Sequence, residues 1–179
     1  HSLAEKRFLG AVIPPGTDGY LSLRRAMEVI SAHPNVGPFI GTQLIQRLVT
    51  SNPSPAYVGR VAAAFHDDDQ GVRGNLRAVV RAILLDDEAR YPDLTSPEWG
   101  KVREPIVRFS GWARAFGATS NNGAWAMPDT TDNTIRLAQS PMRSASVFNF
   151  FRPRYSPPVT ELARRGQVAP ELQITDETS

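Results

Sequence analysis

Apolar side chains recur every three or four residues along five stretches between residues 19 and 117, which is the spacing of one face of an α-helix. No stretch alternates regularly between apolar and polar positions, so the pattern predicts no β-strand. The chain is therefore expected to be all-α, an irregular bundle of about five main helices. The five stripes consist of Leu23, Met27 and Ile30; Val36, Ile40, Leu44 and Leu48; Val58, Val61, Ala62 and Phe65; Leu76, Val79, Val80, Ile83 and Leu84; and Ile106, Phe109, Ala113 and Phe116.

Turn-forming residues divide the chain into three segments. Residues 1–18 are a turn-rich N-terminal segment, residues 19–117 form the helical core, and residues 118–179 are loop-rich and pack on that core. Ser54 before a proline predicts a helix N-cap. Short helices are expected in the third segment between Asp132 and Leu137, after Ser140, around residues 148–151 and before Gly166. Together the segments are expected to form one domain, cut from a larger protein.

The stretch "SVFNFFRPRYSPP", residues 146–158, gathers four aromatic rings around two arginines. Phe148 and Phe151 fall on one face of a helical turn, which predicts that both are buried against the second and fifth helices. Arg152 and Arg154 are then expected to point outward or to pair with acids. The alternative is a surface on which the bases of single-stranded nucleic acid stack.

Charge and composition weigh against that alternative. The 20 basic residues, of which only Lys6 and Lys101 are lysine, face 18 acidic ones, so the net charge is +2. Arginine forms forked ion pairs with carboxylates, and internal pairs of this kind are expected rather than nucleic-acid binding. The chain has no cysteine, which excludes thiol catalysis, thiolate metal sites and disulfides. No apolar run is long enough to predict a membrane span.

Catalytic candidates are few. Glu104, with Arg103 and Arg108 beside it, begins the fifth helix, where an ion pair from Glu104 to Arg108 and the helix dipole account for it without catalysis. A general acid or base is the other interpretation, with Asp86 or Asp87 as a second carboxylate.

His33 stands alone between two helices, where it can satisfy helix-end carbonyls. If the protein is an enzyme, Glu104, His33 and either Arg47 or Arg103 are expected to line one cleft.

The loop "HDDDQGVRG" invites a test for calcium. Asp67 and Asp69 have the one-apart spacing of an EF-hand loop, but Gly71, Val72 and Ala78 stand where that loop needs an oxygen ligand, glycine and glutamate. A solvated loop is therefore the favoured interpretation, and no metal or other cofactor is expected.

Five segments together carry a family likeness: "HPNVGPFIGTQLIQRLVTSNPSPAYVGRVAAAF", "RGNLRAVVRAILLDDEAR", "GKVREPIVR", "QSPMRSASVFNFFRPRYSPP" and "APELQITDETS". In this order they resemble the bacterial family known as domain of unknown function 1800. The resemblance covers nearly all of the chain and implies a C-terminal-half segment of a larger protein. It supplies no activity and no catalytic residues.

What the resemblance does imply is context. Family members look like exported proteins, often encoded beside a sulfatase-like protein. The implied location is the periplasm, the cell envelope or the extracellular space, and the implied partners are that protein and the rest of the same longer chain. The leading hypothesis is a non-catalytic interaction or scaffold domain. The alternatives are a hydrolase whose site is completed by a missing N-terminal half, and a single-stranded nucleic-acid binder.

Overall fold

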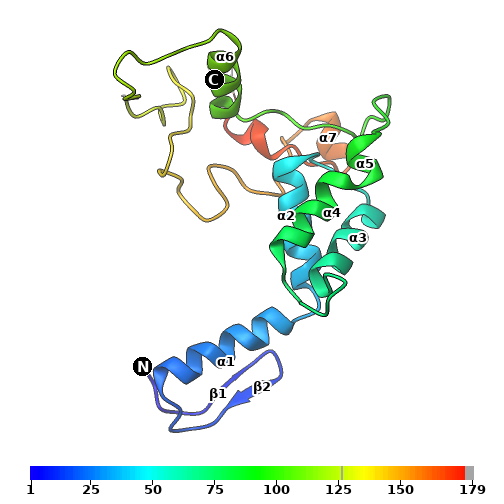
Figure 1. Cartoon of the computed structure of the whole chain (residues 1–179), viewed down its shortest axis with the longest axis vertical. Coiled ribbons are helices and arrows are strands. Elements are labelled where there is room, and N and C mark those ends of the chain that lie inside the picture. Colours follow the sequence, from blue (N-terminus) through cyan, green and yellow to red (C-terminus); the bar gives the residue numbers. More distant parts are fainter. Residues whose placement is uncertain (126, 176–179) are drawn as a thin grey trace. The chain divides into compact units, whose positions relative to one another are not determined.

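The computed structural model of the protein describes residues 1–125 and 127–175. The chain is mostly helical, as predicted, and it divides into two compact units. Unit 1 comprises His1–Ile45 and Ser54–Arg90, and unit 2 comprises Gln46–Pro53 and Tyr91–Ser179. Figure 1 shows the course of the chain and the element labels. That the three predicted segments form one domain stays a prediction.

A small β-hairpin, which the sequence pattern did not predict, opens unit 1. Strand β1 (Lys6–Phe8) pairs antiparallel with β2 (Ala11–Ile13), with Lys6 opposite Ile13. Leu9 and Gly10 connect the strands, and both have positive φ angles, 47° and 76°. Two positive φ angles are what a two-residue hairpin turn of the favoured twist requires. Strands of three residues are too short to show alternation, which is why the expectation of no strand was wrong.

Helix α1 (Gly19–Ala32) follows the hairpin. Its N-cap is Asp18, whose side chain accepts a hydrogen bond from the Leu21 backbone N–H at 2.9 Å. Strand β2 contacts this helix, and Ser22 is its buried residue. The predicted stripe of Leu23, Met27 and Ile30 is present on the helix, but these side chains are exposed.

The remaining helices of unit 1 surround its apolar core. They are α2 (Val36–Leu48, which continues into unit 2 after Ile45), α3 (Pro55–His66), α4 (Leu76–Leu85) and α5 (Asp87–Arg90). Ser54 caps α3 as predicted, because its hydroxyl accepts from the Tyr57 N–H at 3.0 Å. A side-chain carbon at Gly41 would stand 3.1 Å from Val61, so α2 approaches α3 closely there. The buried side chains of these helices include Ile45, Tyr57, Val61, Phe65, Val79 and Ile83.

Unit 2 holds α6 (Pro105–Ala115), α7 (Glu161–Arg164) and the short 3₁₀ helix η1 (Pro170–Gln173). Its interior is polar: the buried residues include Gln46, Thr50, Ser51, Thr130, Gln139, Ser140, Gln167 and Glu171, beside Ala138, Phe151 and Ala169. Hydrogen bonds connect many of its segments that are far apart in the sequence. Asn52, for example, donates to the Val168 carbonyl at 3.0 Å and accepts from the Val168 N–H at 2.8 Å.

Three of the short helices expected in the loop-rich segment are absent from its described residues. Residues 133–135 form turns, and Asp132 accepts from the Thr134 N–H instead of capping a helix. A turn also follows Ser140. Residues 146–149 form a tight turn closed by a bridge between Ser146 and Asn149. The helix expected before Gly166 is α7, and Gly166 has a φ of 68°.

The burial of the aromatic stretch differs from the prediction in one ring. Phe151 is 3% exposed, which confirms its expected burial, whereas Phe148 is 42% exposed. Without a helical turn the two side chains no longer share a face. Arg152 and Arg154 are exposed, as expected.

Candidate functional site

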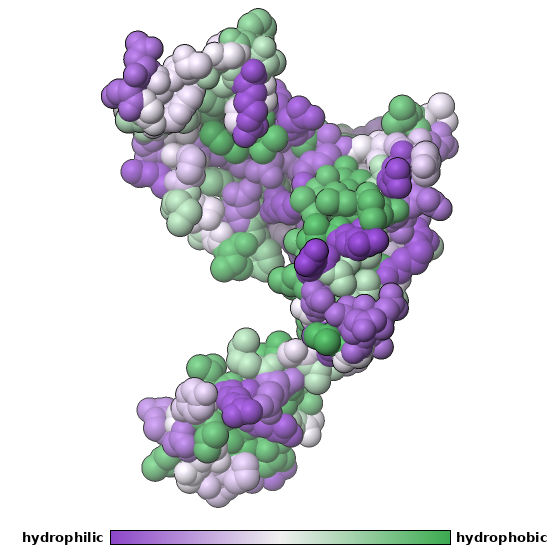
Figure 2. Space-filling model, in the orientation of Figure 1, coloured by the Kyte–Doolittle hydropathy of each residue, from purple (hydrophilic) through white to green (hydrophobic). Residues whose placement is uncertain are grey.

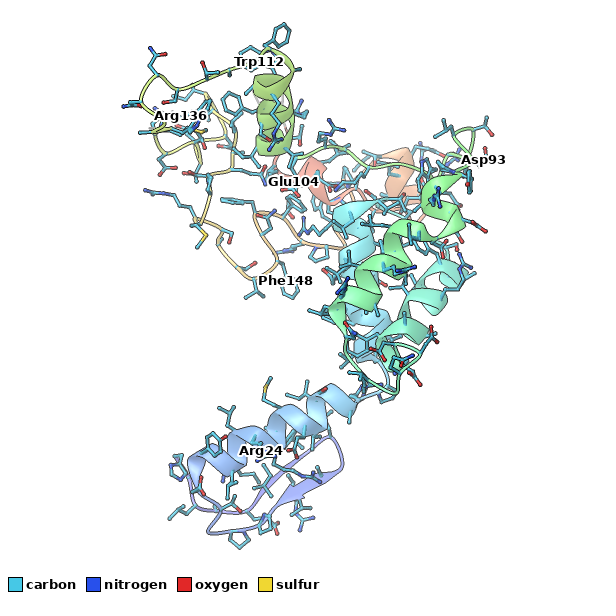
Figure 3. All side chains as sticks on the ribbon, in the orientation of Figure 1. Arg24, Asp93, Glu104, Trp112, Arg136 and Phe148 are labelled. Carbon is cyan, nitrogen blue, oxygen red and sulfur yellow. The ribbon has the colours of Figure 1, made fainter. Side chains whose placement is uncertain are left out.

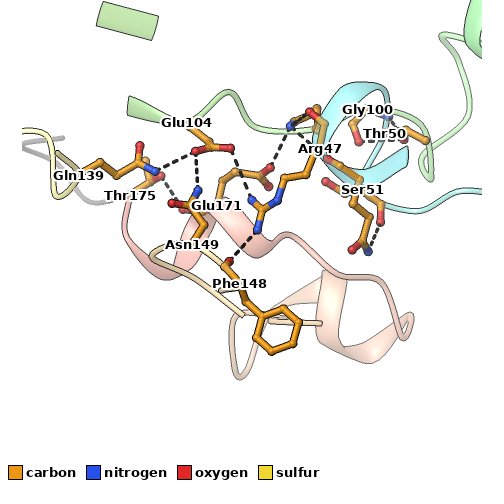
Figure 4. Close-up of polar contacts among 12 residues, drawn as sticks. Arg47, Thr50, Ser51, Gly100, Glu104, Gln139, Phe148, Asn149, Glu171 and Thr175 are labelled. Atoms are coloured by element: carbon orange, nitrogen blue, oxygen red, sulfur yellow. Dashed lines mark hydrogen bonds and ion pairs between the residues drawn. The ribbon is translucent and has the colours of Figure 1, made fainter. Parts of the chain in front are cut away.

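The end of helix α2 anchors a cluster of charged side chains in unit 2 (Figure 4). The last carbonyls of an α-helix lack partners within the helix and favour a nearby cation. The Lys101 ammonium provides both a hydrogen-bond donor and a positive charge at this helix end. It donates to the carbonyls of Gln46 at 3.1 Å and Arg47 at 3.0 Å. Thr50 and Ser51 then bind the neighbouring Gly100 backbone. This places Lys101 and Arg47 beside each other.

Lys101 also pairs with a buried carboxylate. Its ammonium lies 3.2 Å from Glu171 Oε1, and the Glu171 side chain is 1% exposed. Within the described part of the chain, the second oxygen, Oε2, is buried without a hydrogen-bond partner. A buried ion pair contributes little net stability, but removing one partner leaves an uncompensated charge in the interior.

Arg47 makes three different contacts. Nη1 lies 3.5 Å from Glu104 Oε1, and Nη2 donates to the Phe148 carbonyl at 2.8 Å. The guanidinium also lies over the Phe151 ring, 4.4 Å from its centroid. A cation over an aromatic face is attracted by the ring's electron density. Arg47 therefore holds the aromatic stretch against the end of α2, and Phe151 owes its burial partly to this contact.

Glu104 is the centre of the cluster. It is the N-cap residue of α6, but its side chain makes no capping hydrogen bond. Its Oε2 instead accepts from Gln139 Nε2 at 2.8 Å and from Asn149 Nδ2 at 2.9 Å. Gln139 Oε1 accepts from the Ile106 N–H at 3.2 Å, so Gln139 caps the first turn of α6 from far along the chain. Asn149 has a φ of 75°, a conformation in which asparagine is enriched.

This arrangement suits a structural network better than acid or base chemistry. Both carboxylate oxygens of Glu104 have partners, and its side chain is 14% exposed. The two cations, Arg47 and Lys101, face the two anions Glu104 and Glu171, so the charges balance. The cluster joins the end of α2, the start of α6, the 139–151 loop and η1. Figure 3 locates Glu104 and Phe148 in unit 2.

The other catalytic candidates have separate environments. His33 belongs to unit 1, is exposed, and accepts a hydrogen bond through Nδ1 from the Asn35 N–H at 3.2 Å. Arg103 belongs to unit 2 and is exposed, with its guanidinium beside Gly111. The structure therefore brings Arg47 to Glu104. The larger cleft that would also include His33 stays a prediction.

Asp86 lies in a second charged cluster, in unit 1. Arg60 forms a forked pair with it, through Nε at 2.7 Å and Nη2 at 2.8 Å, and also reaches Glu88 at 2.9 Å. These hydrogen bonds hold the pKa of Asp86 below its ordinary value. Nearby, burial raises the pKa of Tyr57 to about 12, and its hydroxyl donates to the Ile83 carbonyl. The cluster fastens α3 to the end of α4 and to α5.

The loop tested for calcium is closed by its own backbone. Asp67 Oδ1 accepts from the N–H groups of Asp69 and Gly71, each at 2.9 Å. Asp68 accepts from two further N–H groups and from the Asn75 amide, and these hydrogen bonds lower its pKa. Among residues 1–125 and 127–175, no group of three or more histidine or acidic side chains is placed to hold a metal ion.

Sequence reasoning named Arg47 and Glu104 but missed Gln139 and Asn149. Their amides come from a loop whose path no local pattern encodes. The one available signal was the residue type of Asn149, because asparagine is common in tight turns.

Comparison with known proteins gives one result. The chain matches, over residues 1–179, the family described as "Protein of unknown function (DUF1800)". No curated protein and no solved structure matches it.

Proposed function

We propose that this chain, which belongs to the family of unknown function DUF1800, is a non-catalytic interaction and scaffold domain of an exported bacterial protein. The observation that carries the proposal is an open row of apolar side chains on α1. Tyr20, Leu23, Met27 and Ile30 are 74%, 63%, 59% and 46% exposed. Their spacing of three and four residues places them along one face of the helix.

The other faces of α1 are accounted for. Ser22, Ala26 and Val29 are the less exposed positions and share a second face of the helix, which contacts β2 only in part, because Leu21, Arg24, Arg25 and Glu28 also line a groove with β2. A third face carries Arg24 and Arg25, which both pair with Glu28. In Figure 2, hydrophobic and hydrophilic residues alternate over the surface that α1 and the hairpin form. The open row is therefore distinct from both of these faces and carries no charge of its own.

Covering this row has a clear energetic benefit. Fully burying one large apolar side chain is worth about 1.5–3 kcal/mol, and four of them lie in line. Contiguous exposed apolar patches typically mark interaction surfaces. The proposed occupant is another protein, for which the family resemblance suggests a sulfatase-like protein encoded nearby, or another part of the same longer chain. A location in the periplasm, the cell envelope or outside the cell is part of the proposal.

The polar clusters support the non-catalytic side of the proposal. Glu104, the strongest catalytic candidate, has both oxygens engaged by three side chains. A general base needs access to the proton that it removes. The hydrolase alternative therefore gains nothing from this residue.

The test places a photo-crosslinking amino acid at single positions of α1 in the full-length protein in its native host. Crosslinks from positions 23 and 27 to one repeatable species are expected, with none from the charged positions 24 and 25. Leu23→Asp should remove the crosslink from position 27. Crosslinks of equal strength from all four positions would contradict the α1 surface.

The non-catalytic claim is tested separately. A broad activity screen should find no turnover that depends on Glu104. Turnover lost in Glu104→Gln and retained in Leu23→Asp, with both variants folded, would overturn the scaffold proposal in favour of an enzyme.

A further inference from the structure

The loop that follows α6 (Figure 1) contains a tight turn around an asparagine and a glycine. The Gly123 N–H donates to the Ser120 carbonyl at 3.2 Å, which closes the turn. Gly123 has a φ of 70°, a conformation that glycine adopts without strain. Asn122 and Gly123 are both exposed. The Asn122 side chain is therefore open to water and stands directly before a residue that has no side chain.

This neighbour distinguishes Asn122 from the other asparagines of the chain. The backbone nitrogen that follows an asparagine can attack the side-chain amide, and a side chain on that following residue obstructs the approach. Around Gly123 the space is open, because a side-chain carbon placed there would meet no atom within 4 Å. Larger residues follow the other asparagines, which are Asn35, Asn52, Asn75, Asn121, Asn133 and Asn149.

The amide oxygen of Asn122 has hydrogen-bond donors beside it. Oδ1 accepts from the Ala124 N–H at 3.0 Å, and the Ser120 hydroxyl lies 2.8 Å away. This hydroxyl also lies 2.7 Å from the Ala124 carbonyl, and its one hydrogen serves one oxygen at a time. Negative charge that develops on Oδ1 draws the hydrogen to that oxygen. The turn therefore stabilises an attacked amide more than the resting one.

We propose that Asn122 is a self-modification site, at which the side-chain amide is converted to a carboxylate. Hydroxide removes the proton of the Gly123 backbone nitrogen, and this nitrogen forms a bond to Asn122 Cγ. Oδ1 carries the negative charge of the tetrahedral intermediate, where Ala124 and Ser120 donate to it. The Cγ–Nδ2 bond then breaks, and Nδ2 takes a proton from water and leaves as ammonia, which returns the hydroxide.

The product of this step is a five-membered succinimide ring, which water opens at either of its two carbonyls. One opening gives aspartate, and the other gives isoaspartate, in which the main chain passes through the former side chain. The net reaction consumes one water and releases one ammonia, so it needs no oxidant or reductant.

The modification changes the charge of this region. Residues 105–128 contain no aspartate or glutamate, so the product carries the only carboxylate of that stretch. Isoaspartate also lengthens the backbone of the turn. The inference goes beyond the proposed function and makes no use of α1, so either can fail without the other.

The experiment incubates the full-length protein in mildly alkaline buffer and follows its tryptic peptides by mass spectrometry over time. The peptide between Arg114 and Arg136 holds Asn121, Asn122 and Asn133, so two of its three asparagines are internal references. Conversion of amide to acid is expected at Asn122 and faster than at either reference. Aspartate and isoaspartate should both form, because the succinimide opens in two ways.

Two variants test the role of the turn. Ser120→Ala should slow the conversion severalfold, less than the roughly 10²–10³ that a donor in a water-excluded oxyanion site contributes, because water also reaches Oδ1 here. Asn121→Gln, the matched control, changes an exposed neighbour and should leave the rate unchanged.

Three results would overturn the inference. The first is a conversion at Asn122 that is no faster than at Asn121 and Asn133. The second is aspartate as the sole product, which would mean direct hydrolysis of the amide without attack by Gly123. The third is an equal or faster conversion in Ser120→Ala, which would show that the turn does not promote the reaction.

Discussion

At the scale of single residues, Phe151 and Phe148 differ sharply although they are three positions apart. Phe151 is 3% exposed beneath Arg47, and Phe148 is 42% exposed. Phe151→Ala should lower the free energy of unfolding by roughly 3–5 kcal/mol through lost burial and a cavity. Phe148→Ala is the matched control and should cost roughly 1 kcal/mol or less. Urea unfolding measures both, and equal losses would show that the burial of Phe151 is unimportant.

The Lys101–Glu171 pair makes a second residue-scale prediction. Lys101→Met leaves the Glu171 carboxylate buried without its cation, which should cost roughly 3–5 kcal/mol. The double variant Lys101→Met with Glu171→Leu removes both charges and should recover most of this loss. A double-mutant cycle from urea unfolding measures the coupling. Additive losses would mean that the two side chains do not interact.

Local sequence patterns were enough to single out some of these residues, but not to predict which residues they contact. Arg47 and Glu104 are 57 positions apart, and their contact depends on how unit 2 folds. The sequence reveals that arginines and acids are balanced, but not which arginine meets which acid. The aromatic stretch was assigned a helical turn from spacing alone, whereas hydrogen bonds to Arg47 and Glu104 fix its course instead.

At the scale of elements, hydrophobic periodicity and capping residues were sufficient for the five main helices. Ser54 and Gly166 mark real helix ends. The same rules failed between residues 130 and 151, where Gln139 caps α6 through space. Periodicity identifies a helix face but does not say what covers it, and the predicted stripe of α1 is exposed for that reason.

The join between α3 and α4 should depend on pH through Asp86. Arg60 lowers the folded-state pKa of this carboxyl below its unfolded value of about 3.9. The stabilisation is therefore fully present above about pH 4 and is lost as pH falls through the folded-state pKa. Asp86→Asn should flatten the decline of unfolding free energy in acid, measured by urea titrations at several pH values. Asp87→Asn changes an exposed neighbouring carboxylate and should leave the decline steep.

At the scale of the whole molecule, the balance of charge argues against the nucleic-acid alternative. Twenty basic residues face 18 acidic ones, and many arginines are held in ion pairs. Nucleic-acid affinity comes largely from phosphate contacts. For single strands, the logarithm of the binding constant falls by about 0.7 per phosphate contact for each tenfold increase in salt concentration. With Phe151 buried and the net charge at +2, we expect no measurable binding at physiological salt.

Fluorescence anisotropy with a labelled oligothymidine, between about 50 and 200 mM salt, measures this directly. Arg152 and Arg154 are the exposed cations of the aromatic stretch, so the variant Arg152→Ala with Arg154→Ala tests that surface. The expected result is weak binding at low salt that the double substitution barely changes, because scattered surface arginines produce only diffuse attraction. Tight binding with a steep salt dependence that the double substitution abolishes would reverse the conclusion. The half-exposed Phe148 would then stack on bases, and the aromatic stretch would be a recognition surface beside its role in holding unit 2 together.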